Sequence, residues 1–112
     1  MNRSSNYRHS RRVNQAIDAT PNELKVRALC ASGYREYDAR RYPEALRLFY
    51  QAWLELPKPQ SSWQESTWVL SSIGDCYFRL QQFKQGCESL TSALYCPAGQ
   101  QSPFIHLRLG QC

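Results

Sequence analysis

The sequence predicts an all-α fold of about five helices, paired as helix–turn–helix repeats. A motif that begins at Gly33 returns 41 residues later at Gly74, with a ring, a small residue, a large apolar residue and an alanine at the same internal offsets. Helix-capping patterns precede three of the expected helices. No stretch alternates polar and apolar residues for long enough to predict a strand. A fixed internal period is typical of repeat arrays, which bind other macromolecules more often than they catalyse reactions.

The first expected helix pair spans residues 20–56. Thr20-Pro21-Asn22-Glu23 is a capping box, in which the Thr20 hydroxyl accepts a bond from a backbone N–H and proline at N1 needs no donor. This helix is expected to run to about residue 39. Pro43 then begins a second helix, because the residue before a proline is disfavoured in the α region. From residue 43 to 56 apolar side chains recur at offsets of three and four, which predicts an amphipathic helix.

A second pair is expected between residues 63 and 95. Two prolines within residues 57–59 end the preceding helix, and Ser62-Trp63-Gln64-Glu65 is a second capping box. The third helix is expected over about 63–80 and the fourth over about 82–95. Ser102-Pro103 then supplies a cap and an N1 proline for a fifth helix of roughly two to three turns.

Composition bounds the class of protein. The length allows one domain, and no apolar run approaches the ~18 residues that a membrane-spanning helix needs. Residues 1–20 hold four arginines against Asp18 and are predicted to be a basic, flexible tail. Residues 21–112 hold ten basic and eight acidic side chains and form the predicted folded domain. The excess positive charge therefore belongs to the tail.

The cysteines and histidines predict neither a disulfide framework nor a metal site. Five cysteines is an odd number, and none of them forms a C-x-x-C pair. This pattern predicts free thiols and a reducing, cytoplasmic location. The two histidines belong to no cluster with zinc-ligand spacing, so no metal and no cofactor are expected.

The repeated motif resembles the tetratricopeptide repeat, a 34-residue helix–turn–helix unit that stacks into a short right-handed α-solenoid. Unit one covers about residues 26–59, unit two about 67–100, and a partial unit three begins at residue 103. The resemblance implies that glycine and small residues let paired helices approach closely. The 41-residue spacing exceeds the usual repeat by seven residues, which predicts a longer loop or an extended first helical turn at 57–66.

Residues 73–78 and 103–111 are also similar to small bacterial tetratricopeptide proteins found beside polymorphic toxins. Some of those are regarded as immunity proteins, so the resemblance implies an immunity or chaperone-like adaptor. An array that stops inside its third unit exposes apolar surface. The chain is therefore expected either to be a fragment of a longer protein or to self-associate through this end.

The resemblance further implies a concave groove, lined by the first helix of each unit, that binds a peptide segment or helix of another protein. Aromatic residues and arginine are favoured in such recognition sites. The other role for each ring is interhelical packing, because aromatic stripes at helical spacing are typical of cores as well. Further groove positions fall on Arg27, Cys30, Asp38, Ser71, Phe104, Leu107 and Gln111. The residues expected to contact a partner are Tyr34, Tyr37, Trp68, Asp75, Phe78, Arg79 and Arg108.

Catalysis and nucleic-acid binding are the competing functions. The sequence offers no phosphate-binding loop or nucleophile–base pair, and Cys76 beside Asp75 is interpreted as a small buried residue, so no enzyme activity is expected. The arginine-rich tail makes nucleic-acid binding the alternative function. The folded part, however, lacks a basic stripe with interleaved rings. Binding through phosphates would weaken steeply with salt, whereas an aromatic groove would not.

Overall fold

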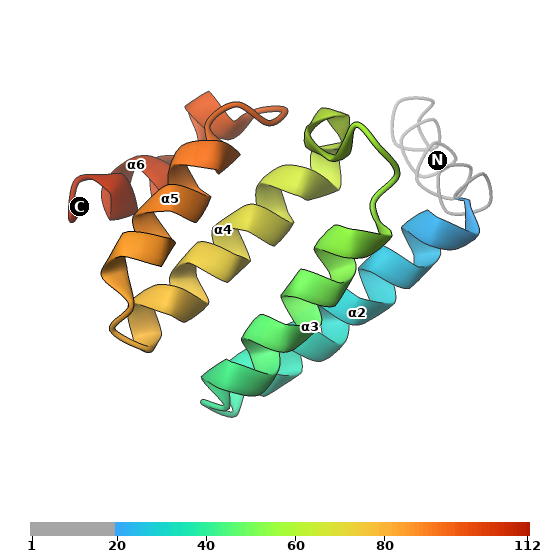
Figure 1. Ribbon diagram of the computed structural model, residues 1–112, viewed down its shortest axis with the longest axis horizontal. Coiled ribbons are helices and arrows are strands. Elements are labelled where there is room, and N and C mark those ends of the chain that lie inside the picture. Colours follow the sequence, from blue (N-terminus) through green and yellow to red (C-terminus); the bar gives the residue numbers. More distant parts are fainter. Residues whose placement is uncertain (1–19) are drawn as a thin grey trace, which may run out of the picture.

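The computed structural model describes residues 20–112, and the predictions for residues 1–19, including the basic tail, lie outside this range. Over the described residues the predicted all-α fold is confirmed, with α-helices, two short 3₁₀ helices and no strand. Helices α2 (Pro21–Asp38) and α3 (Tyr42–Glu55) form one hairpin, and α4 (Gln64–Arg79) and α5 (Phe83–Ala93) form a second beside it (Figure 1). Helix α6 (Pro103–Leu109) packs against α5 near the C-terminus.

Both hairpins close with the same turn. Arg40 and Gln81, which lie 41 residues apart, adopt left-handed backbone conformations with φ of 63° and 60°. The N–H of Arg40 donates to the carbonyl of Tyr37 over 2.9 Å, and that of Gln81 donates to Phe78 over 3.0 Å. The period found in the sequence is therefore also the period of the backbone at these two turns.

Side-chain caps form at α2 and α6, as predicted. Thr20 Oγ1 accepts from the N–H of Glu23 over 3.2 Å, and its hydroxyl donates to the Glu23 carboxylate. Ser102 Oγ accepts from the N–H of Ile105 over 3.3 Å at the start of α6. These bonds satisfy backbone donors that a helix leaves unpaired in its first turn.

The predicted capping box at Ser62 is wrong. The connection between the hairpins contains a cis Lys58–Pro59 bond and the 3₁₀ helix η1 (Gln60–Ser62). Ser62 lies in this 3₁₀ turn, where its hydroxyl donates to the Pro59 carbonyl over 2.8 Å. Helix α4 consequently begins at Gln64 without a side-chain cap. That this connection holds the seven residues in excess of a tetratricopeptide unit stays a prediction.

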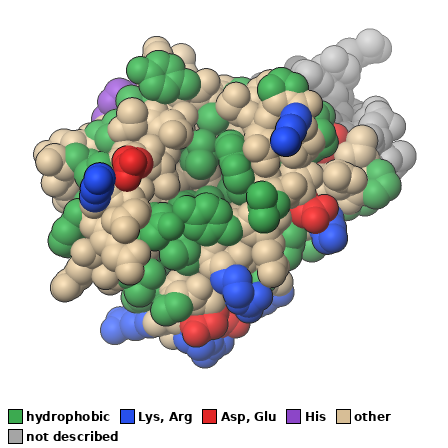
Figure 2. All heavy atoms as spheres, viewed as in Figure 1, with side chains coloured by type: hydrophobic (Ala, Val, Ile, Leu, Met, Phe, Trp, Pro, Cys, Tyr) green, Lys and Arg blue, Asp and Glu red, His purple; other side chains and the backbone are tan. Residues whose placement is uncertain are grey.

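Two hydrophobic clusters hold the helices together. The first includes Val26, Phe49 and Ile73 and joins α2, α3 and α4; the second includes Leu90 and Ile105 and joins α4, α5 and α6. Figure 2 shows hydrophobic side chains gathered over the middle of the face in view, where α4 lies between α3 and α5. No helix within residues 20–112 combines the length and apolar character needed to cross a bilayer.

Glycine permits close helix pairing at equivalent positions of both hairpins. A Cβ atom at Gly33 would lie 2.7 Å from Cε1 of Phe49, and one at Gly74 would lie 2.8 Å from Cγ of Leu90. Real Cβ atoms do not approach a neighbour so closely, so any larger residue forces the helices apart or displaces the facing side chain. The expected role of glycine in helix approach is confirmed at both sites.

We therefore expect Gly33→Leu to destabilise the protein by about 1–3 kcal/mol or more, because the added side chain must displace buried Phe49. Urea unfolding followed by circular dichroism measures the loss. Ala31→Leu, at an exposed position of the same helix, is the matched control and should change stability little. An unchanged unfolding midpoint for Gly33→Leu would contradict the packing described here.

The expectation that the cysteines stay unpaired is wrong for two of them. Cys87 on α5 and Cys112, just beyond α6, form a disulfide that spans 25 residues of sequence, with Cα atoms 6.0 Å apart. Cysteine counting missed this pair because it forms only when α6 folds back along α5, which sequence spacing does not reveal. Cys30, Cys76 and Cys96 are free. The disulfide removes the cysteine argument for a reducing compartment.

Reduction of this disulfide is expected to loosen α6, because a seven-residue helix has little stability of its own. We expect Cys112→Ser to lower the free energy of unfolding by roughly 2–4 kcal/mol and to speed amide exchange at Ile105. Hydrogen exchange by NMR, with and without reductant, measures both effects. Reductant should change the wild-type chain and leave Cys112→Ser unaffected. Equal exchange in all samples would show that α6 does not depend on the cross-link.

Candidate binding groove

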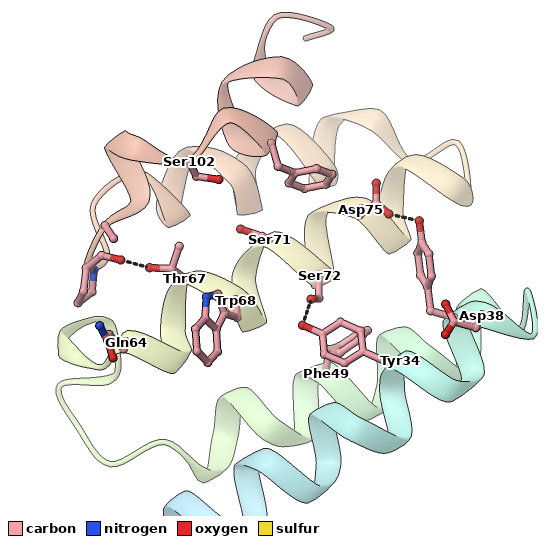
Figure 3. A pocket seen from close by; sticks show the side chains of 14 residues that line it. Tyr34, Asp38, Phe49, Gln64, Thr67, Trp68, Ser71, Ser72, Asp75 and Ser102 are labelled. Atoms are coloured by element: carbon pink, nitrogen blue, oxygen red, sulfur yellow. Dashed lines mark hydrogen bonds between the residues drawn. The ribbon is translucent and has the colours of Figure 1, made fainter. Parts of the chain in front are cut away.

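A cavity of about 520 Å³ opens among the helices that begin each predicted unit (Figure 3). Helices α2 and α4 supply most of its walls, α3 contributes one ring, and α6 closes one side together with the chain segment before it. The lining combines rings, hydroxyls, an amide and two carboxylates. Its polar and aromatic members are Tyr34, Tyr37, Asp38, Phe49, Gln64, Thr67, Trp68, Ser71, Ser72, Asp75, Ser102 and Phe104.

Three rings in this lining remain accessible. Trp68 on α4 is 60% exposed, Tyr34 on α2 is 45% exposed, and Phe104 on α6 is also exposed. Tyr34 is held in place because its ring packs edge-on against buried Phe49, with centroids 5.1 Å apart, and its hydroxyl shares a 3.2 Å hydrogen bond with Ser72. The groove therefore presents aromatic surface from α2, α4 and α6, with Tyr34 held in place by its neighbours.

A buried carboxylate connects these three helices. Asp75 on α4 is only 8% exposed, and its Oδ2 accepts a hydrogen bond from the hydroxyl of Tyr37 on α2. Its Oδ1 lies 2.7 Å from Nη2 of Arg108 on α6, which makes an ion pair although the contact lacks hydrogen-bond alignment. The Tyr37 oxygen accepts in turn from Nε of Arg79 over 2.9 Å. One side chain thus fixes α2 and α6 against α4.

A second cavity, of about 510 Å³, lies beside the first. Arg108 lines this second cavity, and its ion-pair partner Asp75 lines the larger one. Arg79 and Arg108 both line the second cavity, and each guanidinium lies against rings. Arg79 sits 5.7 Å from the ring centre of Tyr37, and Arg108 sits 5.3 Å from that of Phe78. The face of an aromatic ring attracts a cation, and these contacts orient the side chains of both arginines.

The structure brings the predicted contact residues together in two groups, and it buries two of them. Phe78 is 9% exposed and belongs to the second hydrophobic cluster, and Asp75 is engaged in the ion pair, so neither offers a free surface. The larger cavity is lined by Tyr34, Tyr37, Trp68 and Asp75, and the smaller by Phe78, Arg79 and Arg108.

Sequence reasoning missed the contribution of the chain after α5. Pro97 and Ala98 close one end of the larger cavity, because the hydroxyl of buried Thr67 donates to the Pro97 carbonyl over 2.6 Å. Ala98 adopts φ of 61°, which redirects the chain toward the 3₁₀ helix η2 (Gly99–Gln101). Helical periodicity carries no signal for such a contact between a helix and a distant loop.

The free thiols near the groove are not activated. Burial, with a smaller contribution from the negative charge of Asp75, raises the pKa of the Cys76 thiol to about 12. Burial likewise raises the pKa of Cys30 to about 11. Both thiols are therefore protonated at neutral pH, whereas the thiolate is the nucleophile. In the part of the chain from residue 20 onward, no group of three His, Cys, Asp or Glu side chains is placed to hold a metal ion.

Comparisons with protein-family models, with curated proteins and with solved structures found no match to this chain. The resemblance to tetratricopeptide repeats and the use of the cavity therefore stay predictions. The cavity itself offers ring faces, hydroxyls and two carboxylates, a set of groups that suits noncovalent binding.

The bond between Tyr37 and Asp75 has a consequence at high pH. Burial, reinforced by the hydrogen bond to Asp75, raises the pKa of Tyr37 to about 12, whereas an unfolded tyrosine ionises near 10. Stability associated with this phenol is complete below about pH 10 and is lost as pH rises toward 12. We therefore expect the unfolding free energy to fall between about pH 10 and 12 more steeply in the wild type than in Tyr37→Phe. Urea unfolding at each pH tests this, and equal slopes would contradict it.

Proposed function

We propose that this chain is a noncatalytic protein-interaction module of the tetratricopeptide type. In this proposal the larger cavity holds an extended segment or an amphipathic helix of a partner protein. The observation that carries it is the presentation of exposed rings from α2, α4 and α6 around one cavity, with Asp75 tying the three helices together. The recurrence of one turn at Arg40 and Gln81 supports the repeat assignment.

The chemistry of the cavity favours a peptide. Its volume lies within the range of about 300–1,000 Å³ that is typical of ligand sites. Rigid aromatic side chains provide large contact areas at low entropic cost and are enriched among residues that dominate binding energy. The similarity of residues 73–78 and 103–111 to toxin-associated bacterial proteins extends the proposal to an adaptor or immunity role.

Selection of phage-displayed random dodecapeptides on the full chain tests the proposal. We expect peptides whose affinity, measured by fluorescence polarisation, falls at least tenfold in Trp68→Glu, a loss of about 1.4 kcal/mol. Trp68 is 60% exposed, so this change leaves folding intact. Leu54→Glu is the matched control, because Leu54 is 74% exposed on α3 and does not line the cavity.

The outcomes separate the competing functions. Peptides that bind Trp68→Glu as well as the wild type would contradict the proposed groove. Affinity that changes little between 50 and 200 mM salt is expected for an aromatic groove. Tight binding of single-stranded oligonucleotides with a steep salt dependence would favour the nucleic-acid alternative instead.

A further inference from the structure

The charged side chains that line the larger cavity are all acidic. Its lining includes two aspartates, Asp38 and Asp75, and no lysine, arginine or histidine. Arg79 and Arg108 line the neighbouring cavity instead. A segment held in the larger cavity therefore meets acidic side chains and no basic one in the lining.

The two aspartates differ in what they already contact. Asp75 is buried, bonded to Tyr37 and paired with Arg108, so its charge is balanced within the fold. Asp38 is exposed at the last residue of α2, and no ion pair within residues 20–112 includes its carboxylate. Asp38 is thus the carboxylate of this cavity that a ligand can reach.

The rings beside Asp38 also favour a cation. The face of a tryptophan or tyrosine attracts a guanidinium or ammonium group, and the aliphatic stem of arginine or lysine packs well on apolar surface. Tyr34 lies between Trp68 and Asp38 in the cavity (Figure 3). A basic side chain that reaches Asp38 can therefore rest its stem against the exposed ring of Tyr34.

Contacts between α2 and α4 give the distance along the cavity between Asp38 and Trp68. The Tyr34–Ser72 and Tyr37–Asp75 bonds each join residues 38 apart, which places Asp38 level with residue 76 of α4. Trp68 lies eight residues earlier on that helix, a distance of about 12 Å at the rise of an α-helix. An extended segment covers this distance in about three or four residues.

We propose that the partner segment carries an arginine or lysine that pairs with Asp38, about three or four residues from a large apolar side chain that covers Trp68. The inference rests on the proposed function, because it names the chemistry of a ligand for the same cavity. It excludes acidic segments, which would bring like charge to an unbalanced carboxylate.

A charge exchange tests the proposal. The same dodecapeptide library is selected in parallel on the full-length wild type, on Asp38→Lys and on Glu88→Lys. Glu88 is an exposed carboxylate on α5 that does not line the cavity, so its variant controls for the change in net charge. We expect the wild type and Glu88→Lys to enrich a basic residue at the stated spacing, and Asp38→Lys to enrich aspartate or glutamate there.

One enriched peptide then supplies a quantitative check. Replacing its basic residue by glutamate should weaken binding to the wild type at least tenfold, and Asp38→Lys should recover most of that loss. Peptides that depend on Trp68 but show no basic preference, or no response to Asp38→Lys, would overturn this inference and leave the proposed function standing. Absence of any Trp68-dependent peptide would overturn both. Basic peptides that bind Trp68→Glu equally well would show general charge attraction and also contradict the inference.

Discussion

A single buried carboxylate sets the geometry of the binding face. Asp75 lies on α4 and contacts Tyr37 of α2 and Arg108 of α6, so it joins three helices that belong to three different predicted units. Removal of one partner from a buried ion pair typically costs about 3–5 kcal/mol, because the other charge is left unbalanced. The relative positions of Tyr34, Trp68 and Phe104, and with them the shape of the cavity, depend on this interaction.

Two further constraints shape the same binding face. The close approach at Gly33 and Gly74 brings each hairpin together around a buried side chain, and the one at Gly33, Phe49, also lines the groove. The Cys87–Cys112 disulfide ties the end of α6 to α5 and so restrains the helix that carries Arg108. The disulfide, the Arg108–Asp75 ion pair and the Tyr37–Asp75 hydrogen bond thus link the C-terminus to α2.

Local signals in the sequence predicted the elements well. The caps at Thr20 and Ser102 form because each hydroxyl bonds to an N–H only three residues away, an interaction that needs no tertiary contact. The spacing of Gly33 and Gly74 likewise indicated close helix pairs, since the steric need for glycine repeats with the motif. The Ser62 box failed because a 3₁₀ turn, which places the serine hydroxyl on Pro59, competes with capping.

The parts of the site that could not be predicted depend on long-range contacts. Aromatic spacing placed Tyr34 and Trp68 on the groove, but it could not distinguish them from Phe78, which the packing of α5 and α6 buries. The pairing of Asp75 with Arg108 and the approach of Pro97 to Thr67 each join residues about 30 or more apart. No pattern of propensity or capping specifies such pairs, because they are set by how the hairpins stack.

The central claim is that a partner segment occupies the cavity formed by α2, α4 and α6. The most direct test is a ¹⁵N chemical-shift map of the full chain with one selected peptide. The largest changes are predicted at Tyr34, Trp68 and Phe104, which line that cavity. A separate cavity of about 390 Å³ between α3, α4 and α5 is lined by Tyr50, Trp53 and Leu70. Largest changes at those residues would place the partner on the other surface and contradict the claim.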